Sequence, residues 1–294
     1  MGRLSSFLVF LFIFSCEEVI DLDLVQQQPR LIIDAIIRVD RSQEFVPIEV
    51  KVSLTTSYFN ENEPASLDTA YIYYGKEENG DIINSKYSYL AEQEPGTGVY
   101  IPDPDSPTDQ RINSVDITED TTFYLVIEFE GKTYFSKTKF IPTVPLDNVE
   151  QGSQTLFEDE IEIIVTFTDD ANREDFYLFD YSNGNYIVSE DKFYQGQEFS
   201  FSYFYEDPVE IGDELEIKIL GADRSFYNYM FLFLQQTEGS FGFFETPAAT
   251  IRGNIYEVSD IENPENTNNI QNPDANPLGY FAVIQEYKKT LKIE

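Results

Sequence analysis

The sequence predicts an all-β protein made of two immunoglobulin-like β-sandwich domains in tandem, the second carrying one amphipathic helix. Short segments of alternating apolar and polar residues recur along the chain between turn signals. About seven of these segments fall within residues 31–140, which is the strand density of an immunoglobulin-like sandwich. A Pro-containing segment at residues 141–147 separates them from a second series at residues 148–294.

The first predicted domain opens with an apolar run at residues 31–37 and continues at residues 46–54. In the latter, apolar and polar residues alternate with the period of two that marks a half-buried strand. Further strands are expected at residues 70–74, 82–90, 99–101, 123–129 and 133–140. The turn sequences Asn79-Gly80-Asp81 and Glu130-Gly131-Lys132 join neighbouring strands as hairpins. Because the cysteine pair of antibody domains is missing, the pattern predicts the architecture only.

The second predicted domain follows Pro142 and Pro145, which favour an extended connector. Its strands are expected at residues 161–167, 176–181, 186–189, 199–205 and 215–219, with closing strands at 278–285 and 290–293. The Asn183-Gly184 turn joins two of them. An Asn- and Pro-rich stretch at residues 257–277 is expected to form a long surface loop.

One segment departs from the strand pattern and predicts the helix. Its apolar residues recur at helical spacing and are Phe226, Tyr229, Met230, Phe233 and Leu234. Asp223 or Ser225 can cap the start of this helix, and Gly239 is placed to end it. We interpret the aromatic stripe as core packing rather than as a ligand site, so the helix is expected to lie over the second sandwich.

The N-terminus contains Arg3, an apolar run at residues 4–14 and the small residue Ser15, directly before the only cysteine of the chain, Cys16. This is the layout of a secretory signal peptide over residues 1–15, and the run is shorter than the roughly 20 residues of a membrane span. A cysteine that follows the cleavage point can be acylated on its thiol and its new α-amino group, which anchors a protein stably. We therefore predict lipidation at Cys16 and a lipidated tether at residues 16–30. The alternatives are a plain secretory signal with an incidental cysteine, or an uncleaved anchor.

The composition excludes several classes of function. A formal net charge of −35 repels nucleic acid and anionic headgroups. Aromatic residues at 15% and apolar residues at 41% indicate a folded core rather than an acidic disordered chain. The chain has no histidine and no cysteine besides Cys16, which removes a Ser-His-Asp triad, thiol chemistry and the usual zinc ligands. No pair of carboxylates stands out, so we do not expect an enzyme.

Calcium is the one metal that the acidic loops could bind. The candidate ligands are Asp103, Asp105 and Asp109, since calcium takes carboxylate and carbonyl oxygens. The loop at residues 168–172 is a second candidate. Neither matches an EF-hand, and we favour the alternative that these Asp and Asn side chains bond their own backbone in turns.

A partner surface is the other candidate site. Phe204 stands among serines in an aromatic segment, and Phe241, Phe243 and Phe244 lie in a Gly-containing segment. Together they could form an exposed apolar patch of the kind that marks partner surfaces. Burial between strand, helix and loop is the alternative, which we favour.

Several stretches together resemble one protein family. Cys-Glu-Glu-Val-Ile-Asp-Leu-Asp-Leu at residues 16–24 resembles the start of the Bacteroidota outer-membrane lipoproteins grouped as domain of unknown function 4249. Further similar stretches are Pro95-Gly96-Thr97-Gly98-Val99-Tyr100, Ser225-Phe226-Tyr227-Asn228-Tyr229, Ile251-Arg252-Gly253-Asn254-Ile255 and Pro277-Leu278-Gly279-Tyr280-Phe281. They follow the family's order across essentially the whole mature chain. Ile13, in place of the usual leucine three residues before the cysteine, and the bulky Phe14 depart from the family pattern.

The resemblance implies an outer-membrane lipoprotein without an assigned activity, associated with TonB-dependent receptors. It also implies that Glu17 and Glu18 form a surface-export signal. We therefore expect a non-catalytic, lipid-anchored accessory protein of a TonB-dependent receptor or other barrel complex, at the cell surface or on the periplasmic face. The alternative is a surface glycan- or calcium-dependent binding module that supplies such a receptor. Beyond the covalent lipid and a calcium ion, no cofactor is expected, and nucleic acid is not an expected partner.

Overall fold

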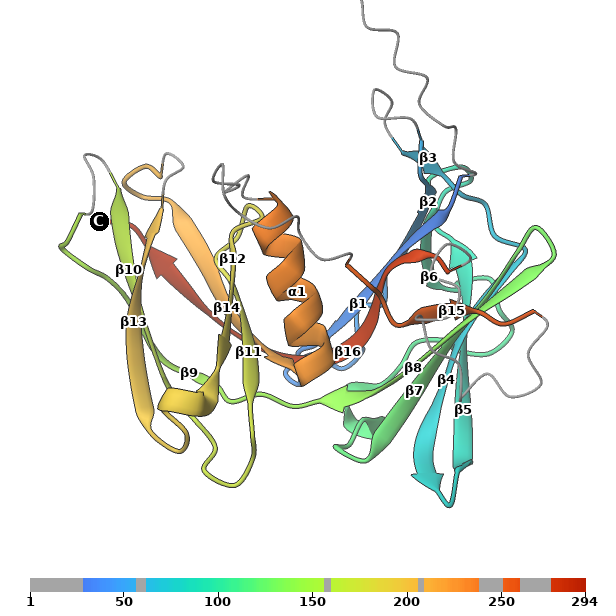
Figure 1. The fold of residues 1–294 in the computed structure, drawn as a ribbon, viewed down its shortest axis with the longest axis horizontal. Coiled ribbons are helices and arrows are strands. Elements are labelled where there is room, and N and C mark those ends of the chain that lie inside the picture. The colour runs from blue at the N-terminus through green and yellow to red at the C-terminus, as the bar shows by residue number, and fades with distance from the viewer. Residues whose placement is uncertain (1–28, 57–61, 156–159, 206–208, 238–250, 260–275) are drawn as a thin grey trace, which may run out of the picture.

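The computed structural model describes residues 29–56, 62–155, 160–205, 209–237, 251–259 and 276–294 (Figure 1). These residues form β-strands, one α-helix and two short 3-10 helices, Ser114–Asp116 and Asp191–Phe193. The strands are β1 (Leu31–Val39), β2 (Val50–Leu54), β3 (Glu63–Pro64), β4 (Thr69–Glu78), β5 (Asp81–Glu92), β6 (Val99–Pro102), β7 (Thr121–Phe129), β8 (Lys132–Ile141), β9 (Leu146–Gln151), β10 (Ile161–Thr168), β11 (Phe176–Asp180), β12 (Tyr186–Glu190), β13 (Glu198–Tyr205), β14 (Glu214–Ala222), β15 (Ile255–Glu257) and β16 (Leu278–Lys292). The helix is α1 (Arg224–Thr237).

The main sheet closes into an eight-stranded mixed barrel. Its strand order is β16-β1-β2-β6-β5-β4-β7-β8, and β8 pairs back onto β16. The pairings of β16 with β1 and with β8 are parallel, and the other pairings around the barrel are antiparallel. The interior is filled by apolar side chains such as Ile33, Ile72, Phe123, Leu125 and Phe281. The barrel is therefore a packed core.

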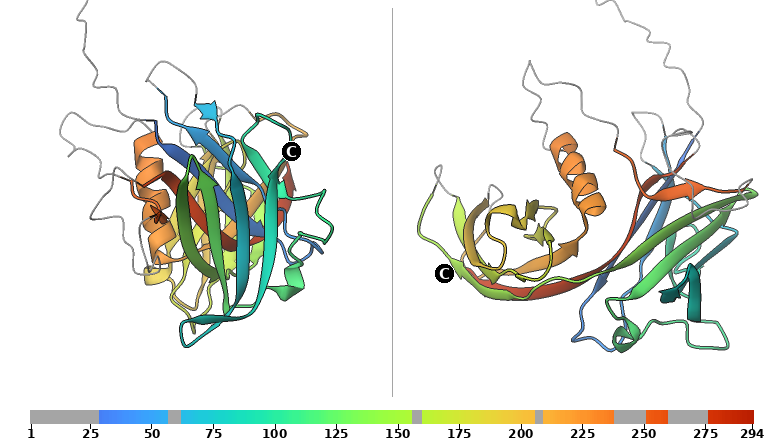
Figure 2. Two further views of the ribbon diagram at one scale, coloured as in Figure 1. Left: turned by 90° about the vertical axis from the view of Figure 1, so that its right-hand side faces the viewer. Right: turned by 60° about the horizontal axis from the view of Figure 1, so that its bottom comes forward.

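Strand β16 continues beyond the barrel into a second group of sheets, as Figure 2 shows in red. Its C-terminal half pairs with β14 and extends the sheet in the order β12-β11-β14-β16. A separate sheet, β13-β10-β9, shares an apolar core with this extension. Phe167, Tyr177, Phe179, Ile217 and Ile219 are among the buried side chains of that core.

Helix α1 is packed against this extended sheet, in a separate apolar cluster. Its buried residues Phe226 and Met230 pack with Leu178, Leu220 and Ala282. The predicted cap is confirmed, because the carboxylate of Asp223 accepts a hydrogen bond from the backbone N–H of Phe226 at 2.7 Å. No helix in the part of the chain that the structure describes is long and apolar enough to cross a membrane.

The expected immunoglobulin-like sandwich at residues 31–140 is wrong, because these strands belong to the barrel instead. The cause is β16, which lies far away in the sequence and pairs in parallel with both β1 and β8. A sandwich would leave the outer strands of its sheets unpaired, whereas β16 joins the first and last strands of this region. Strand β16 belongs both to the barrel and to the second group of sheets. The predicted domain boundary at residues 141–147 stays a prediction.

Most of the predicted strands are present, and the differences are local. The two closing strands expected at residues 278–285 and 290–293 are the single strand β16. The connector expected at residues 141–147 gives way to β9 at Leu146. Strands β3 and β15 were not expected.

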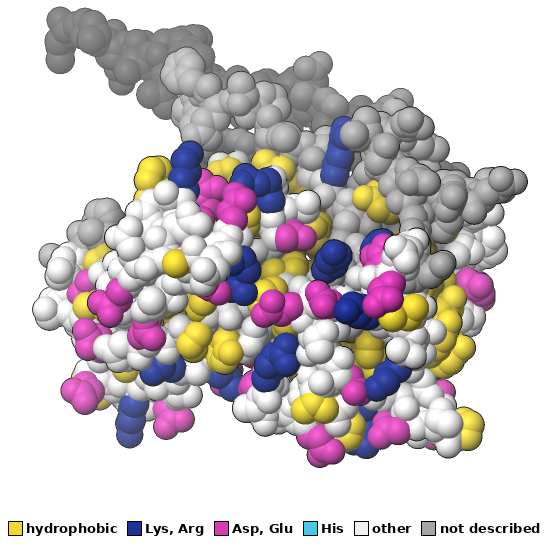
Figure 3. Space-filling model, turned by 90° about the horizontal axis from the view of Figure 1, so that it is seen from below, with side chains coloured by type: hydrophobic (Ala, Val, Ile, Leu, Met, Phe, Trp, Pro, Cys, Tyr) yellow, Lys and Arg dark blue, Asp and Glu magenta, His cyan; other side chains and the backbone are white. Residues whose placement is uncertain are grey.

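Figure 3 shows basic and acidic side chains interspersed over one face of the molecule.

Candidate functional site

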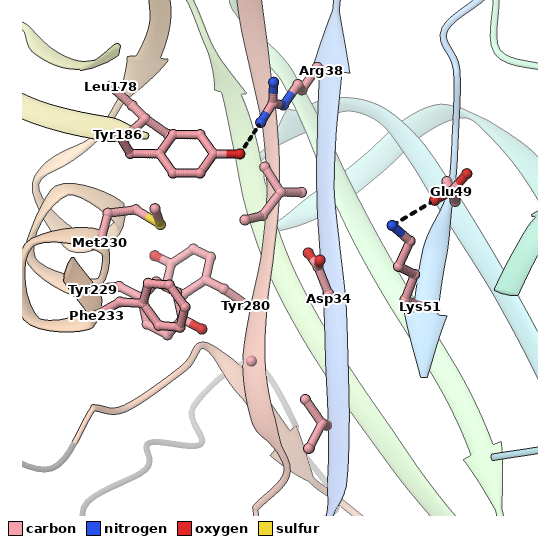
Figure 4. A pocket seen from close by; sticks show the side chains of 13 residues that line it. Asp34, Arg38, Glu49, Lys51, Leu178, Tyr186, Tyr229, Met230, Phe233 and Tyr280 are labelled. Atoms are coloured by element: carbon pink, nitrogen blue, oxygen red, sulfur yellow. Dashed lines mark hydrogen bonds and ion pairs between the residues drawn. The ribbon is translucent and has the colours of Figure 1, made fainter. Parts of the chain in front are cut away.

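A groove lies between the outer face of the barrel and helix α1 (Figure 4). Its cavity volume is about 570 Å³, within the range of about 300 to 1,000 Å³ that small-molecule sites occupy. Strands β16, β1 and β2, which are neighbours in one sheet, form one wall, while α1, β11 and β12 contribute the other. The lining residues are Ile32, Asp34, Ile36, Arg38, Glu49, Lys51, Leu178, Tyr186, Tyr229, Met230, Phe233, Gly279 and Tyr280. We call this the α1 groove.

The alternation of β1 places charged residues in the α1 groove. Leu31, Ile33 and the following odd-numbered residues of β1 are buried in the barrel core. Ile32, Asp34, Ile36 and Arg38 therefore face outward, since successive side chains of a strand point to opposite faces. On the opposite wall, Tyr229, Met230 and Phe233 come from one side of α1.

A buried ion-pair network, the Arg38 network, closes one end of the α1 groove. Arg38 Nη1 lies 2.6 Å from Asp180 Oδ2 and 3.5 Å from Glu286 Oε2. Arg38 Nη2 donates a hydrogen bond to the Tyr186 hydroxyl at 3.3 Å (Figure 4). The network joins β1 of the barrel to β11, β12 and β16. It therefore holds the second part of the fold against the barrel wall.

Burial shapes the electrostatics of this network. The carboxylates of Asp180 and Glu286 are only 7% and 10% exposed, and the Arg38 side chain is 28% exposed. Burial raises the pKa of Glu286, and the Arg38 charge opposes that rise. Burial also acts to lower the pKa of Arg38, but the hydrogen bond and the charge of Asp180 outweigh it, so that pKa is raised. The ion pairs thus keep Arg38 charged.

The side of the α1 groove that lies along β2 is more open (Figure 4). Lys51 Nζ lies 3.0 Å from Glu49 Oε1, and both side chains are more than half exposed. Asp34 stands opposite Lys51 in the ladder between β1 and β2. Its carboxylate lies on the same side of β1 as the aromatic side chains of Tyr229, Phe233 and Tyr280 (Figure 4). Burial, followed by the nearby charge of Asp34, raises the pKa of Tyr229 to about 12.

Two glycines allow close backbone crossings beside the groove. Gly279 has φ +102°, and a Cβ there would collide with the carbonyl oxygen of Ile33 on β1. A Cβ on Gly253 would collide with the carbonyl oxygen of Gly279. Asn254 secures this crossing, because its side chain accepts a hydrogen bond from Phe281 N at 2.9 Å and donates one to Phe281 O at 2.8 Å. Two of the stretches that carry the family resemblance thus meet at one point.

A second surface feature lies on the outer face of β4 and β5. Tyr71 and Tyr73 of β4 pair with Tyr89 and Tyr87 of β5, and the ring centroids lie 5.5 and 5.8 Å apart. Tyr87 and Tyr89 are 50% and 48% exposed. Tyr124 of β7 stacks on Tyr73 with centroids 4.5 Å apart. We call Tyr71, Tyr73, Tyr87 and Tyr89 the tyrosine platform.

Several of the predicted site residues lie outside the described residues. These are Cys16, Glu17, Glu18, Phe241, Phe243 and Phe244. Phe204 is described: it lies on β13 opposite Glu162 of β10 and is half-buried. The structure therefore does not test the lipid site or the apolar patch as a whole.

The predicted calcium ligands have local partners. Asp103 Oδ1 accepts a hydrogen bond from the backbone N–H of Asp105 at 2.9 Å, and Asp109 Oδ1 accepts one from Arg111 N at 3.0 Å. Hydrogen bonds from Arg111 lower the pKa of Asp109 to about 2. Asp170 likewise accepts a bond from Asn172 N at 3.0 Å. These bonds are the turn chemistry that the sequence favoured.

No group of three or more His, Cys, Asp or Glu side chains is arranged to hold a metal ion among the described residues. Calcium binding stays a prediction.

Of the α1 groove, the sequence singled out Tyr229, Met230 and Phe233, and interpreted them as core packing. Met230 is buried, whereas Phe233 is 40% exposed and lines the groove. The charged residues of the groove and the tyrosine platform were not singled out. The signal for the groove was the pair of charges at Asp34 and Arg38 within an otherwise apolar strand, and the signal for the platform was the same-face pairs Tyr71, Tyr73 and Tyr87, Tyr89.

Comparison with known proteins identifies a family. A family model described as "Domain of unknown function (DUF4249)" matches residues 17–290, which is nearly the whole chain. The match begins at the residue that follows Cys16. No curated protein matches the chain.

Proposed function

Because this chain belongs to the DUF4249 family, we propose that it is a non-catalytic Bacteroidota lipoprotein, anchored in the outer membrane through Cys16. In this role it is an accessory protein of a TonB-dependent receptor or other barrel complex, facing the cell surface. The observation that carries the proposal is the N-terminus: a signal-like run ends at Cys16, and the family match begins at the next residue. Glu17 and Glu18 then serve as the surface-export signal.

The fold supports a binding role for the anchored part. The α1 groove is a cavity of about 570 Å³, and Phe231 and Phe233 on α1 are 41% and 40% exposed. Exposed aromatic side chains beside a groove are a common feature of contact surfaces. A net charge of −35 keeps such a surface away from anionic headgroups while the lipid holds it at the membrane.

Replacing Cys16 by alanine is expected to release the protein from the membrane, because the acyl chains have no other thiol to occupy. The wild-type chain should carry a diacyl or triacyl adduct on Cys16 and copurify with a barrel protein from detergent-solubilised outer membranes. The variant should be found in the soluble fraction. Mass spectrometry of the mature N-terminus and fractionation of the two proteins measure both results.

Glu17→Gln with Glu18→Gln is the matched control, because it removes the acidic pair and keeps Cys16. This variant should keep its lipid adduct and its membrane fraction but become resistant to protease added to whole cells. An unmodified Cys16 in the wild type, or recovery of the lipidated protein without any barrel partner, would count decisively against the proposal.

The tyrosine platform favours a second candidate function, a surface module that binds a neutral glycan and supplies a receptor. Tyrosine offers an apolar ring together with a hydrogen-bonding hydroxyl, which suits the mixed apolar and hydroxylated faces of a sugar. The nearby Lys137 is paired with Glu77 at 3.0 Å, so it offers no free positive charge to an anion. The charge of the whole chain likewise disfavours acidic polysaccharides.

Alanine at both Tyr87 and Tyr89 is expected to weaken binding of a neutral hexasaccharide, such as cellohexaose or maltohexaose, by about tenfold or more. The reason is loss of the exposed aromatic contact area. Isothermal titration calorimetry on the soluble Cys16→Ala chain, with and without calcium, measures the effect. Phe193→Ala is the control, because Phe193 is 85% exposed and lies outside the platform. Equal affinity of the double variant and this control would exclude the platform as the glycan site.

A further inference from the structure

The charges that line the α1 groove are not all directly paired. Arg38 is engaged by Asp180, Glu286 and Tyr186, and Lys51 is paired with Glu49. Asp34 makes no direct hydrogen bond or ion pair among the described residues. Lys51 stands across the ladder from it, and the charge of Asp34 helps to raise the pKa of Lys51. The four charges that line the groove, those of Asp34, Glu49, Arg38 and Lys51, sum to zero. Asp34 is the one carboxylate among them that has no direct ion-pair partner, since Glu49 is paired with Lys51.

Aromatic rings lie beside Asp34 and across the groove from it, since Tyr280 is its register neighbour on β16 and Tyr229 and Phe233 come from α1. Tyr229 and Tyr280 lie with their ring centroids 4.7 Å apart, and Tyr229 and Phe233 lie 6.4 Å apart. Aromatic rings attract cations through their negative faces, and a carboxylate near them adds a charge partner. Phe233 is 40% exposed, so part of this aromatic surface is open to a ligand. Aromatic rings and one open carboxylate thus line the same cavity.

The electrostatic field of the whole chain also favours a cationic ligand. A net charge of −35 concentrates cations at the surface and repels anions. A groove of about 570 Å³ with an apolar wall also admits more than a bare ion. The chemistry that fits is a cationic head on an apolar body.

We propose that the α1 groove binds an organic cation, namely an ammonium or guanidinium group carried on an apolar or aromatic body. The cationic head pairs with Asp34, and the apolar body packs on Tyr229, Tyr280 and Phe233. The same head can belong to a free amine or to a basic side chain of a polypeptide. The site goes beyond the proposed anchoring and does not depend on it.

The test uses the soluble full chain carrying Cys16→Ala, so a failure of lipidation or of the barrel partner leaves this result unaffected. The probes are phenethylammonium, its neutral counterpart 2-phenylethanol, and a capped Phe-Arg dipeptide, titrated by calorimetry. Phenethylammonium or the dipeptide should bind at least about tenfold more tightly than the neutral probe. Binding of the dipeptide alone assigns the site to a polypeptide side chain, and binding of phenethylammonium assigns it to a free amine as well.

Asp34→Asn should weaken binding of the cationic probe by about tenfold and leave the neutral probe unchanged. Asp105→Asn is the matched control, because it removes the same charge from an exposed loop outside the groove. Phe233→Leu should also weaken binding, with no effect expected on folding at an exposed position. If neither cation binds, if the neutral probe binds equally well, or if Asp34→Asn behaves as Asp105→Asn does, the proposal is overturned.

Discussion

Replacing Gly279 by alanine is expected to lower the free energy of unfolding by about 3 kcal/mol or more. Two costs add at this position. Its φ of +102° disfavours an L side chain by about 1 to 2 kcal/mol, and forcing an extra carbon into a packed site costs about 1 to 3 kcal/mol. The new methyl would meet the backbone carbonyl oxygen of Ile33, which cannot turn aside as a side chain can. Urea denaturation followed by circular dichroism measures the change.

Gly131→Ala separates the two costs. Gly131 lies in the turn between β7 and β8 with φ +73°, and a Cβ there would meet nothing within 4 Å. This control variant should therefore show only the conformational cost, about 1 to 2 kcal/mol. Equal losses in the two variants would refute the close crossing of β16 over β1. A larger loss in Gly279→Ala would locate the additional cost at the parallel pairing that closes the barrel.

Local structure could be predicted where the pattern of one segment is sufficient. The hairpin turns illustrate this, since Asn79, Gly80, Glu130 and Gly131 all have positive φ, as the turn residues suggested. Helix α1 is another case, because its apolar spacing and the cap at Asp223 lie within one stretch. In each case the energetic preference comes from neighbours in sequence.

The closure of the barrel could not be predicted in this way. It depends on β16 pairing with β1 and β8, across most of the length of the chain. Tyr280, Ala282 and Ile284 pack with helix α1, while Phe281 and Val283 fill the barrel. A strand that is buried on both faces appears in the sequence as a continuous apolar run. Such a run does not indicate which strands it pairs with. Near its C-terminal end β16 becomes charged, and this change of pattern suggested two separate strands. The structure has one strand there, whose C-terminal end is more exposed than the rest.

The candidate site was hidden for the same reason. Asp34 and Arg38 were visible as charges within an apolar strand. The partners of Arg38, however, come from β11, β12 and β16, and the aromatic rings near Asp34 come from α1 and β16. Only the tertiary packing brings Asp180 and Glu286 to Arg38. The lipid site, in contrast, is predicted from a pattern of consecutive residues that ends at Cys16. It could therefore be predicted from the sequence without knowledge of the fold.

Replacing Arg38 by methionine is expected to cost about 3 kcal/mol near neutral pH, because it leaves Asp180 and Glu286 buried without their positive partner. Removing one partner of a buried ion pair usually costs about 3 to 5 kcal/mol. We expect the lower value because Arg38 is itself 28% exposed. Lys51→Met is the matched control. It removes a cation from the same groove, but Lys51 is 60% exposed and should cost no more than about 1 kcal/mol. Urea denaturation of both variants at about pH 8 compares the two losses.

The pH dependence of this loss follows from Glu286. Burial already raises its pKa in the folded wild type above the ordinary 4.5, and loss of the Arg38 charge raises that pKa further. An acid whose pKa is raised by folding destabilises the folded state when ionised, so the penalty is full above the folded pKa and is removed below the unfolded one. The loss in Arg38→Met should therefore shrink as the pH falls from about 8 to about 5. A loss that stays constant over this interval, or that matches the Lys51→Met control, would show that Arg38 does not hold Glu286 in its ionised state.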